Sequence, residues 1–236
     1  MGQPHQAGPK YVIVVIIDTT QPPTQNIAFF TAHPDDHEMM LAYHTLDALA
    51  AAGPGNLYAY VATDGTASTL GDPAFVHAGH RRQESQAGLT RLGLAAHHLH
   101  YPGLPDGQLS DPAVSNRLAA DISAFITAHH ITRAVTLGPD GGDHHPDHIS
   151  VHNAVAQAAR EAARAAGQSI ELISLSANHT GARIIKSTPA TRSAKLAALA
   201  CHPSQFPDVT HLPDLYRPYL EAETYDHTQA LTKVKL

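Results

Sequence analysis

The sequence predicts an α/β fold: a Rossmann-like three-layer sandwich with helices on both sides of a mostly parallel sheet. Apolar, β-branched runs alternate with stretches of helical periodicity along most of the 236 residues. Such alternation implies βαβ crossovers, which place successive strands parallel. Polar clusters also follow directly after predicted strands, and ligands bind beyond the carboxyl ends of strands in open parallel sheets.

The predicted strands are short apolar runs bounded by turn residues. They cover Tyr11–Asp18, Asn26–Ala32, Leu57–Ala62, His97–Tyr101, Arg133–Leu137, Ile170–Ser174 and Arg183–Ile185. The predicted helices carry apolar residues at spacings of three and four. They cover His37–Ala52, His80–Leu92, Pro112–His129, Asp147–Ala166 and Ala190–Cys201.

One domain is expected over residues 1–236, because the length fits one large domain and no repeat or linker divides it. Its core is expected over about 11–175. An elaborated C-terminal region is expected over about 176–236, where the Pro-rich segment Pro203–Pro218 shows less regular patterning.

The composition is that of a globular protein, with 43% hydrophobic and 15% charged residues. A net charge of -6 argues against nucleic acid as a partner, since phosphates would meet an anionic protein. The single cysteine allows no intrachain disulfide. The longest apolar run, Tyr11–Ile17, is too short to span a bilayer. We therefore expect a soluble, cytoplasmic protein without a membrane span.

Two clusters carry residues that ligate metals. His33-Pro-Asp-Asp36 offers a histidine and a carboxylate, which are borderline-metal ligands, although an aspartate there could equally cap a helix. His145-Pro-Asp-His148 places two histidines three residues apart at the opening of a helix, where they share a face. Three protein ligands with an open position are typical of catalytic zinc.

Such a site suits hydrolysis of an amide or ester. A metal lowers the pKa of water and polarises a carbonyl, a nearby carboxylate takes the proton, and a protonated histidine stabilises the oxyanion. The sequence contains neither a Gly-x-Ser-x-Gly elbow nor a Gly-x-Gly-x-x-Gly turn. Serine-hydrolase chemistry and dinucleotide binding are therefore less favoured.

Several motifs, in this order, resemble the LmbE-like (PIG-L) zinc-dependent N-deacetylase family over roughly residues 26–206. They are Ala32-His-Pro-Asp-Asp-His-Glu38, Thr63-Asp-Gly65, Arg81-Arg-Gln-Glu84, Leu104-Pro-Asp-Gly107, His145-Pro-Asp-His148 and Ser204-Gln205-Phe206. The resemblance implies an LmbE-like fold and one Zn²⁺ per chain, held by His33, Asp36 and His148. It also implies Asp35 as the general base.

The resemblance implies further roles near the metal. His145 would stabilise the oxyanion and protonate the leaving amine, and Asp147 would orient a histidine as part of the catalytic group. Arg81 and Asp64 fall at substrate-binding positions. An alternative for Arg81 is an ordinary surface pair with Glu84, which would contribute little.

The expected function is removal of an N-acetyl or other N-acyl group from an amino sugar or related conjugate. One alternative is an amidase that cleaves a larger acyl-amine bond in a thiol conjugate or antibiotic-type substrate. Another is a catalytically inactive metal-binding module. The partner would be a small N-acylated substrate, and a homo-oligomer is possible. The flanking His37, His44 and His144 are expected on a helix surface or in a loop.

Overall fold

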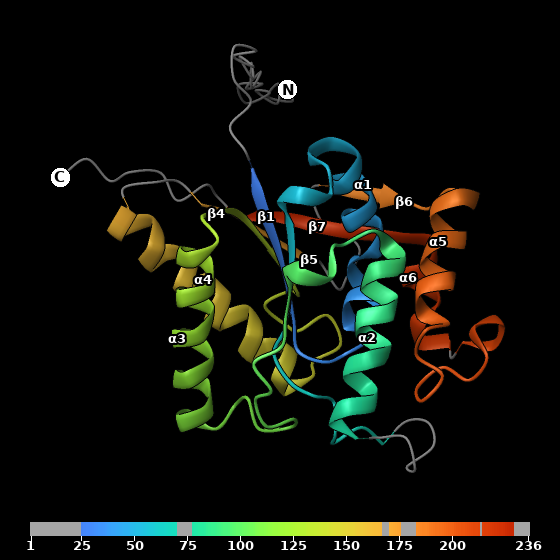
Figure 1. The fold of residues 1–236 in the computed structure, drawn as a ribbon, viewed down its shortest axis with the longest axis horizontal. Coiled ribbons are helices and arrows are strands. Elements are labelled where there is room, and N and C mark those ends of the chain that lie inside the picture. Colours follow the sequence, from blue (N-terminus) through green and yellow to red (C-terminus); the bar gives the residue numbers. More distant parts are fainter. Residues whose placement is uncertain (1–24, 70–76, 167–169, 176–182, 213, 229–236) are drawn as a thin grey trace, which may run out of the picture.

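The part of the chain that the structure describes folds around one seven-stranded mixed sheet (Figure 1). The computed structural model describes residues 25–69, 77–166, 170–175, 183–212 and 214–228. The strands are β1 (Asn26–Thr31), β2 (Leu57–Val61), β3 (Leu99–His100), β4 (Ile131–Thr136), β5 (Glu171–Leu175), β6 (Arg183–Lys186) and β7 (Ala222–Thr228). Their order across the sheet is β3-β2-β1-β4-β5-β7-β6.

Helices cover both faces of the sheet. They are α1 (Ala42–Ala52), α2 (Ala78–Leu92), α3 (Pro112–Ala128), α4 (Pro146–Ala166), α5 (Pro189–Leu199) and α6 (Arg217–Glu221). A π-helical turn, η1 (His37–Leu41), precedes α1, and 3₁₀ turns lie at Pro54–Asn56, Ala96–His98, Val209–His211 and Asp214–Tyr216. Helices α3 and α4 pack together on one face, whereas α1, α2 and α5 lie on the other (Figure 1). Within the described residues, no helix is long and apolar enough to cross a membrane.

The predicted α/β class with a mostly parallel sheet is confirmed. Strands β1, β2, β3, β4 and β5 pair parallel, and β7 pairs antiparallel with both β5 and β6. The chain leaves β1 toward β2 on one side and returns to β4 on the other. The gap between β1 and β4 is therefore the topological switch point, where ligands bind in open sheets.

The central strand β1 is buried on both faces, as expected for a strand covered by helices on each side. Phe30 packs into the core under α3 and α4, and Phe29 packs into the opposite core with Met39 and Met40. Burial of β1 on both faces holds its carboxyl end in place, and the residues that follow β1 inherit this rigidity.

The structure departs from the predicted elements near β1 and at the C-terminal end. The continuous helix expected over His37–Ala52 begins instead with η1, a π-helical turn of the kind often found at functional sites. Strand β7 and helix α6 were not predicted, because their sequence lacks a clear period. The strand expected over Tyr11–Asp18 lies outside the described residues.

The expectation that His37 and His44 lie on a helix surface is wrong. Both side chains are 1% exposed. They are seven residues apart and so share one helix face, and that face packs on the sheet, with the Phe29 ring 5.0 Å from His37 and 5.6 Å from His44. His144 is exposed in the loop before α4, as expected.

A buried ion pair joins the C-terminal region to α1. Lys195 Nζ donates to Glu223 Oε1 at 2.9 Å and to the Tyr219 carbonyl at 2.6 Å. The Glu223 carboxylate also accepts the backbone N–H groups of Tyr43 and His44, each at 3.0 Å. These N–H groups lie in the first turn of α1, where they have no partner within the helix. Glu223 thus fixes β7 against the start of α1.

Replacing Lys195 by methionine should lower the free energy of unfolding by about 3–5 kcal/mol, because the Glu223 carboxylate would stay buried without its cation. Chemical denaturation measures this loss. Arg192→Ala is the matched control, since it breaks an exposed pair between α5 and α6, Arg192 to Glu221 at 2.8 Å, which should contribute less than about 1 kcal/mol. Equal losses in the two variants would contradict the anchoring role.

Candidate metal centre

The two predicted metal-ligating clusters meet at the switch point between β1 and β4. The turn after β1 carries His33, Asp35 and Asp36, and the loop after β4 leads into α4, which carries His148. Together with the turn after β2, they line a cavity of about 320 Å³. Its polar lining includes His145, Asp106, Arg81 and Gln205 from other elements.

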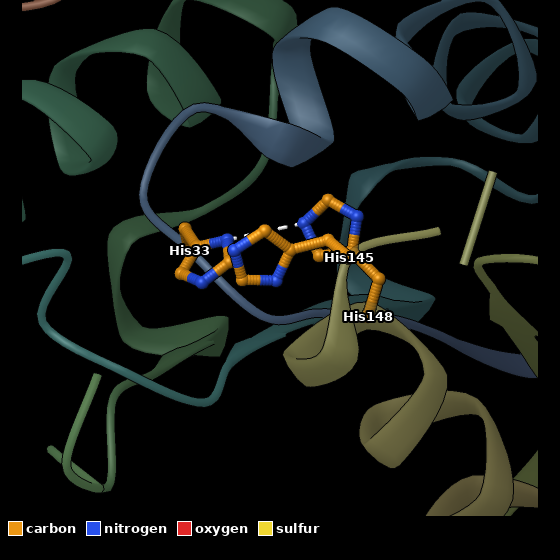
Figure 2. Close-up of side chains that lie close together, drawn as sticks. All are labelled: His33, His145 and His148. Atoms are coloured by element: carbon orange, nitrogen blue, oxygen red, sulfur yellow. Dashed lines mark hydrogen bonds between the residues drawn. The ribbon is translucent and has the colours of Figure 1, made fainter. Parts of the chain in front are cut away.

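Three ligand-type atoms converge at the floor of this cavity. His33 Nδ1 lies 3.1 Å from His148 Nε2 (Figure 2). Asp36 Oδ2 lies 3.4 Å from His33 Nδ1 and 3.2 Å from His148 Nε2. Zinc bonds of roughly 2.0–2.2 Å in tetrahedral geometry separate neighbouring ligand atoms by about 3.3–3.6 Å. The observed triangle is thus close to the size that a zinc site requires.

The other nitrogen of each imidazole faces a carboxylate. His33 Nε2 lies 3.1 Å from Asp106 Oδ1 and 3.4 Å from Asp147 Oδ2. His148 Nδ1 lies 2.8 Å from Asp143 Oδ1 and 3.1 Å from the Gly141 carbonyl. These acceptors assign the ring proton to His33 Nε2 and to His148 Nδ1. With a metal bound, the other nitrogen of each ring would present its lone pair to the metal beside Asp36, as in carboxylate–histidine–metal arrangements.

The Asp36 carboxylate is oriented by the backbone of its own turn. Its Oδ2 accepts the N–H groups of His33 at 2.7 Å and Ala32 at 3.1 Å. Burial alone would raise the pKa of Asp36, but His148 and His33 outweigh burial and hold that pKa well below its ordinary value. Asp36 is therefore an ionised ligand-type oxygen at neutral pH.

The carboxylates around the histidines favour positive charge at this point. Burial alone would lower the pKa of His148, yet Asp36 and Asp143 raise it to about 10. Burial opposes protonation of His33 in the same way, and the carboxylates of Asp36, Asp106 and Asp147 still hold its pKa well above the ordinary value. The same carboxylates that favour protonation of these histidines would also stabilise a cation bound at the triangle.

Asp35 faces the same cavity from a strained backbone position. Its φ of 122° is rare for a residue other than glycine, and such strain often marks functional sites. Burial raises the pKa of Asp35 to about 6, against the opposing effect of Arg81. Asp35 Oδ2 lies 3.2 Å from Arg81 Nη2, so adjacent Asp35 and Asp36 project toward different partners.

Arg81 joins two of the turns rather than pairing with Glu84 on the surface, so the surface-pair alternative is wrong. The side chain is 2% exposed. Nη1 donates to the Gly65 carbonyl at 3.0 Å, and Nη2 donates to the Pro34 carbonyl. Gly65 has φ 71°, and a Cβ there would lie 2.9 Å from both Arg81 Cζ and Pro34 Cδ. Only glycine lets these two turns close around the guanidinium.

His145, directly before α4, and Asp147, in its first turn, border the triangle. The His145 ring lies 4.8 Å from the rings of His33 and His148 (Figure 2). Its Nδ1 accepts the Asp147 N–H at 3.2 Å, which leaves Nε2 to carry the proton. Burial lowers the pKa of His145, and the charges of His33 and His148 add to this effect. His145 is thus a neutral N–H donor, whereas the sequence suggested a protonated histidine.

Among the site residues predicted from the sequence, Asp64 does not line the cavity. Its Oδ1 accepts from the Thr66 N–H at 3.2 Å and hydroxyl at 2.8 Å. Sequence reasoning assigned no role to Asp106 or Asp143, which both contact the histidines. Asp106 belongs to the Leu104-Pro-Asp-Gly107 turn, and that turn is the signal that could have pointed to it.

The donor set fits a borderline divalent metal. Among the described residues, ligand atoms of His33, His145 and His148 lie within 4.8 Å of one another, as do those of His33, Asp106 and Asp147. Both groups contain His33, so they describe two sides of one centre. Imidazole with carboxylate suits zinc better than calcium or magnesium, which prefer oxygen alone.

Solved structures share the fold at low sequence identity. N,N'-diacetylchitobiose deacetylase from Pyrococcus horikoshii is 16% identical with a TM-score of 0.65, over 89% of this chain and 87% of its own. The pseudoaglycone deacetylase Dbv21 is 18% identical with a TM-score of 0.62, over 89% and 100%. The hydratase GalB of Pseudomonas putida KT2440 is 13% identical with a TM-score of 0.63, over 90% and 99%. The fold alone therefore does not define the reaction.

A family match is more specific than the shared fold. No curated protein matches this sequence. However, residues 28–159 match the PIG-L family, described as GlcNAc-PI de-N-acetylase. The matched region covers more than half of the chain, and it contains both the His33-Pro-Asp-Asp36 and the His145-Pro-Asp-His148 motifs. The resemblance seen in the sequence is confirmed, and the chain belongs to the PIG-L family.

Proposed function

We propose that this protein is a zinc-dependent N-deacetylase that acts on an acetylated amino sugar or a conjugate of one. The observation that carries the proposal is the triangle of His33 Nδ1, Asp36 Oδ2 and His148 Nε2, with edges of 3.1–3.4 Å. Family membership supports the reaction type, and the deacetylases among the solved structures with this fold agree with it.

His33, Asp36 and His148 would hold one zinc ion per chain. When bound, zinc supplies Lewis acidity toward the amide carbonyl and toward water. The carboxylates of Asp106 and Asp143 would fix the two imidazoles through their outer nitrogens, and Asp147 would support His33 in the same way. Such outer carboxylates commonly strengthen metal binding.

Asp35 would act as general base. It lies beside the ligand Asp36, and its partner is Arg81 rather than either histidine of the triangle. A carboxylate held in the cavity wall can take a proton from the attacking water and later deliver it. Arg81 would keep Asp35 turned toward the cavity, and we retain a substrate contact as a second role for this arginine.

His145 would donate its Nε2–H to the carbonyl oxygen as negative charge develops there. A neutral imidazole N–H suffices for this task when it is positioned before the reaction. After attack, the C–N bond breaks, the acyl group leaves as the carboxylate, and the amine departs with the proton that Asp35 took from the attacking water.

The cavity at the metal centre favours a substrate whose amine-bearing part is polar. Its lining is rich in carboxylates, amides and hydroxyl groups, among them Asp106, Gln205 and Ser68. Sugar hydroxyl groups form hydrogen bonds with such side chains. This lining, together with the activity named in the family description, is why we propose an amino sugar.

The proposed function first predicts the metal content of the protein. The purified protein should contain about one zinc ion per chain, and His33→Ala/His148→Ala should lose it, because two of three protein ligands are gone. Elemental analysis of the dialysed protein measures both. His144→Ala is the matched control, since this exposed loop residue should keep the metal. Full zinc retention in the double variant would show that His33 and His148 are not the zinc ligands.

Acetate release tests the function and the role of Asp35. Zinc-loaded protein should release acetate from at least one N-acetyl amino sugar in a panel. Asp35→Asn should keep the zinc but lose roughly 10²–10⁴-fold in kcat, because the amide is not basic. Asp36→Asn should instead weaken zinc binding. Full activity of Asp35→Asn, or loss of its zinc with retention in Asp36→Asn, would show these roles to be wrong.

Arg81 provides a separate kinetic prediction. Arg81→Ala removes the contact that holds Asp35, so kcat should fall about tenfold or more with a smaller change in KM. Circular dichroism and zinc analysis check that the fold and metal remain. An increase in KM alone would instead assign Arg81 to uniform substrate binding, as the sequence suggested.

A further inference from the structure

A second, smaller cavity adjoins the metal centre. Its volume is about 50 Å³, against about 320 Å³ for the first cavity. Both cavities are lined by Asp35, Asp36, Asp143, His148 and Tyr216. The ligand triangle therefore lies between two spaces of different size.

The smaller cavity differs from the larger one in its chemistry. Beyond the shared residues, its described lining is Met39, Met40, Phe206 and Tyr219, all side chains that present hydrocarbon, thioether or aromatic surface. Met39 and Met40 come from η1, directly after the ligand turn, and each is at most 5% exposed.

The aromatic side of the cavity is held in place by specific contacts. The Tyr219 hydroxyl donates to the Gly142 carbonyl at 3.2 Å, so its polar end is occupied. The rings of Phe206 and Tyr216 meet edge to face with centroids 5.8 Å apart. These contacts give the cavity a defined size, because tightly packed side chains resist displacement.

An amide whose carbonyl lies at the triangle extends in two directions. The amine side carries the polar part of the substrate, which fits the larger cavity. The acyl side then points into the smaller, apolar cavity. A void needs about 10–15 Å³ to hold one water-sized group, so about 50 Å³ holds roughly three to five such groups. At the larger requirement of about 15 Å³ per group, the space takes about three carbon atoms beyond the carbonyl.

We propose that Met39, Met40, Phe206 and Tyr219 form an acyl pocket that admits acetyl to about butyryl groups and rejects longer chains. The inference rests on the proposed function, because it assumes an amide at the metal centre. It also discriminates between the two hydrolases considered from the sequence, since an amidase for larger acyl groups would need a longer apolar channel.

A series of N-acyl glucosamines with chains of two to eight carbons tests the size limit on zinc-loaded protein. Values of kcat/KM for acetyl to butyryl should lie within about tenfold of one another. Hexanoyl and octanoyl should fall by a further factor of about ten to one hundred, because overpacking a fixed cavity is unfavourable. Equal or rising kcat/KM through octanoyl would overturn the proposal.

Met40→Ala should enlarge the pocket and raise the hexanoyl-to-acetyl ratio of kcat/KM about tenfold. Leu118→Ala is the matched control, because it creates a cavity in the core under α3 and α4 and not in the core cluster that holds the four pocket residues. It should leave the ratio unchanged. Phe206→Leu enlarges the same pocket from the other wall and replaces Met40→Ala should that variant not fold. A constant ratio in the folded variant would contradict the assignment.

A binding measurement separates this proposal from the proposed function. Calorimetry of zinc-loaded protein with acetate, butyrate, hexanoate and octanoate needs no turnover. Affinity should peak near butyrate and fall about tenfold for octanoate, and Met40→Ala should move the peak to hexanoate. If no amino-sugar amide is hydrolysed, the proposed function fails, and this series still decides the pocket. Affinity that rises through octanoate, or no binding of any carboxylate, would overturn the pocket.

Discussion

The convergence of three electron-pair donors at one point is the constraint on which the centre depends. Asp36 Oδ2, His33 Nδ1 and His148 Nε2 lie 3.1–3.4 Å apart. Uncompensated, such atoms repel one another at low dielectric. The carboxylates around the histidines favour positive charge at this point. Asp36 and Asp143, for example, raise the pKa of His148 to about 10. A divalent cation satisfies all three donors at once, which is why we interpret the centre as a metal site.

The fold supplies the rigidity that this convergence needs. Strands β1 and β4 lie side by side in parallel, so the turns that follow them emerge at the same edge of the sheet. Burial of β1 on both faces limits its movement. Arg81 then links the turn after β1 to the turn after β2 through the carbonyls of Pro34 and Gly65. A buried guanidinium with several donors can hold two loops in one geometry, and Asp35 takes its position from the same residue.

The metal site and the smaller cavity draw residues from two different regions of the chain. The family match ends at residue 159, and the three residues of the proposed metal site lie inside it. Phe206, Tyr216 and Tyr219 lie beyond it, and they shape the smaller cavity. Tyr219 is tied to this region through its carbonyl, which accepts from Lys195, the partner of Glu223 in β7. A chitobiose deacetylase and a hydratase share this fold, so the fold alone does not select the ligand.

The sequence by itself determined the α/β class, most of the helices and strands up to β5, and the two motifs of the centre. These features are local: period, turn residues and neighbouring ligands can be read within a few positions. Only the tertiary structure decided that Asp106 and Asp143 face the histidines, that Arg81 is buried against Asp35, and that β7 enters the sheet between β5 and β6. These depend on residues far apart in the chain, and no local pattern records which distant partner satisfies a buried charge or a strand edge.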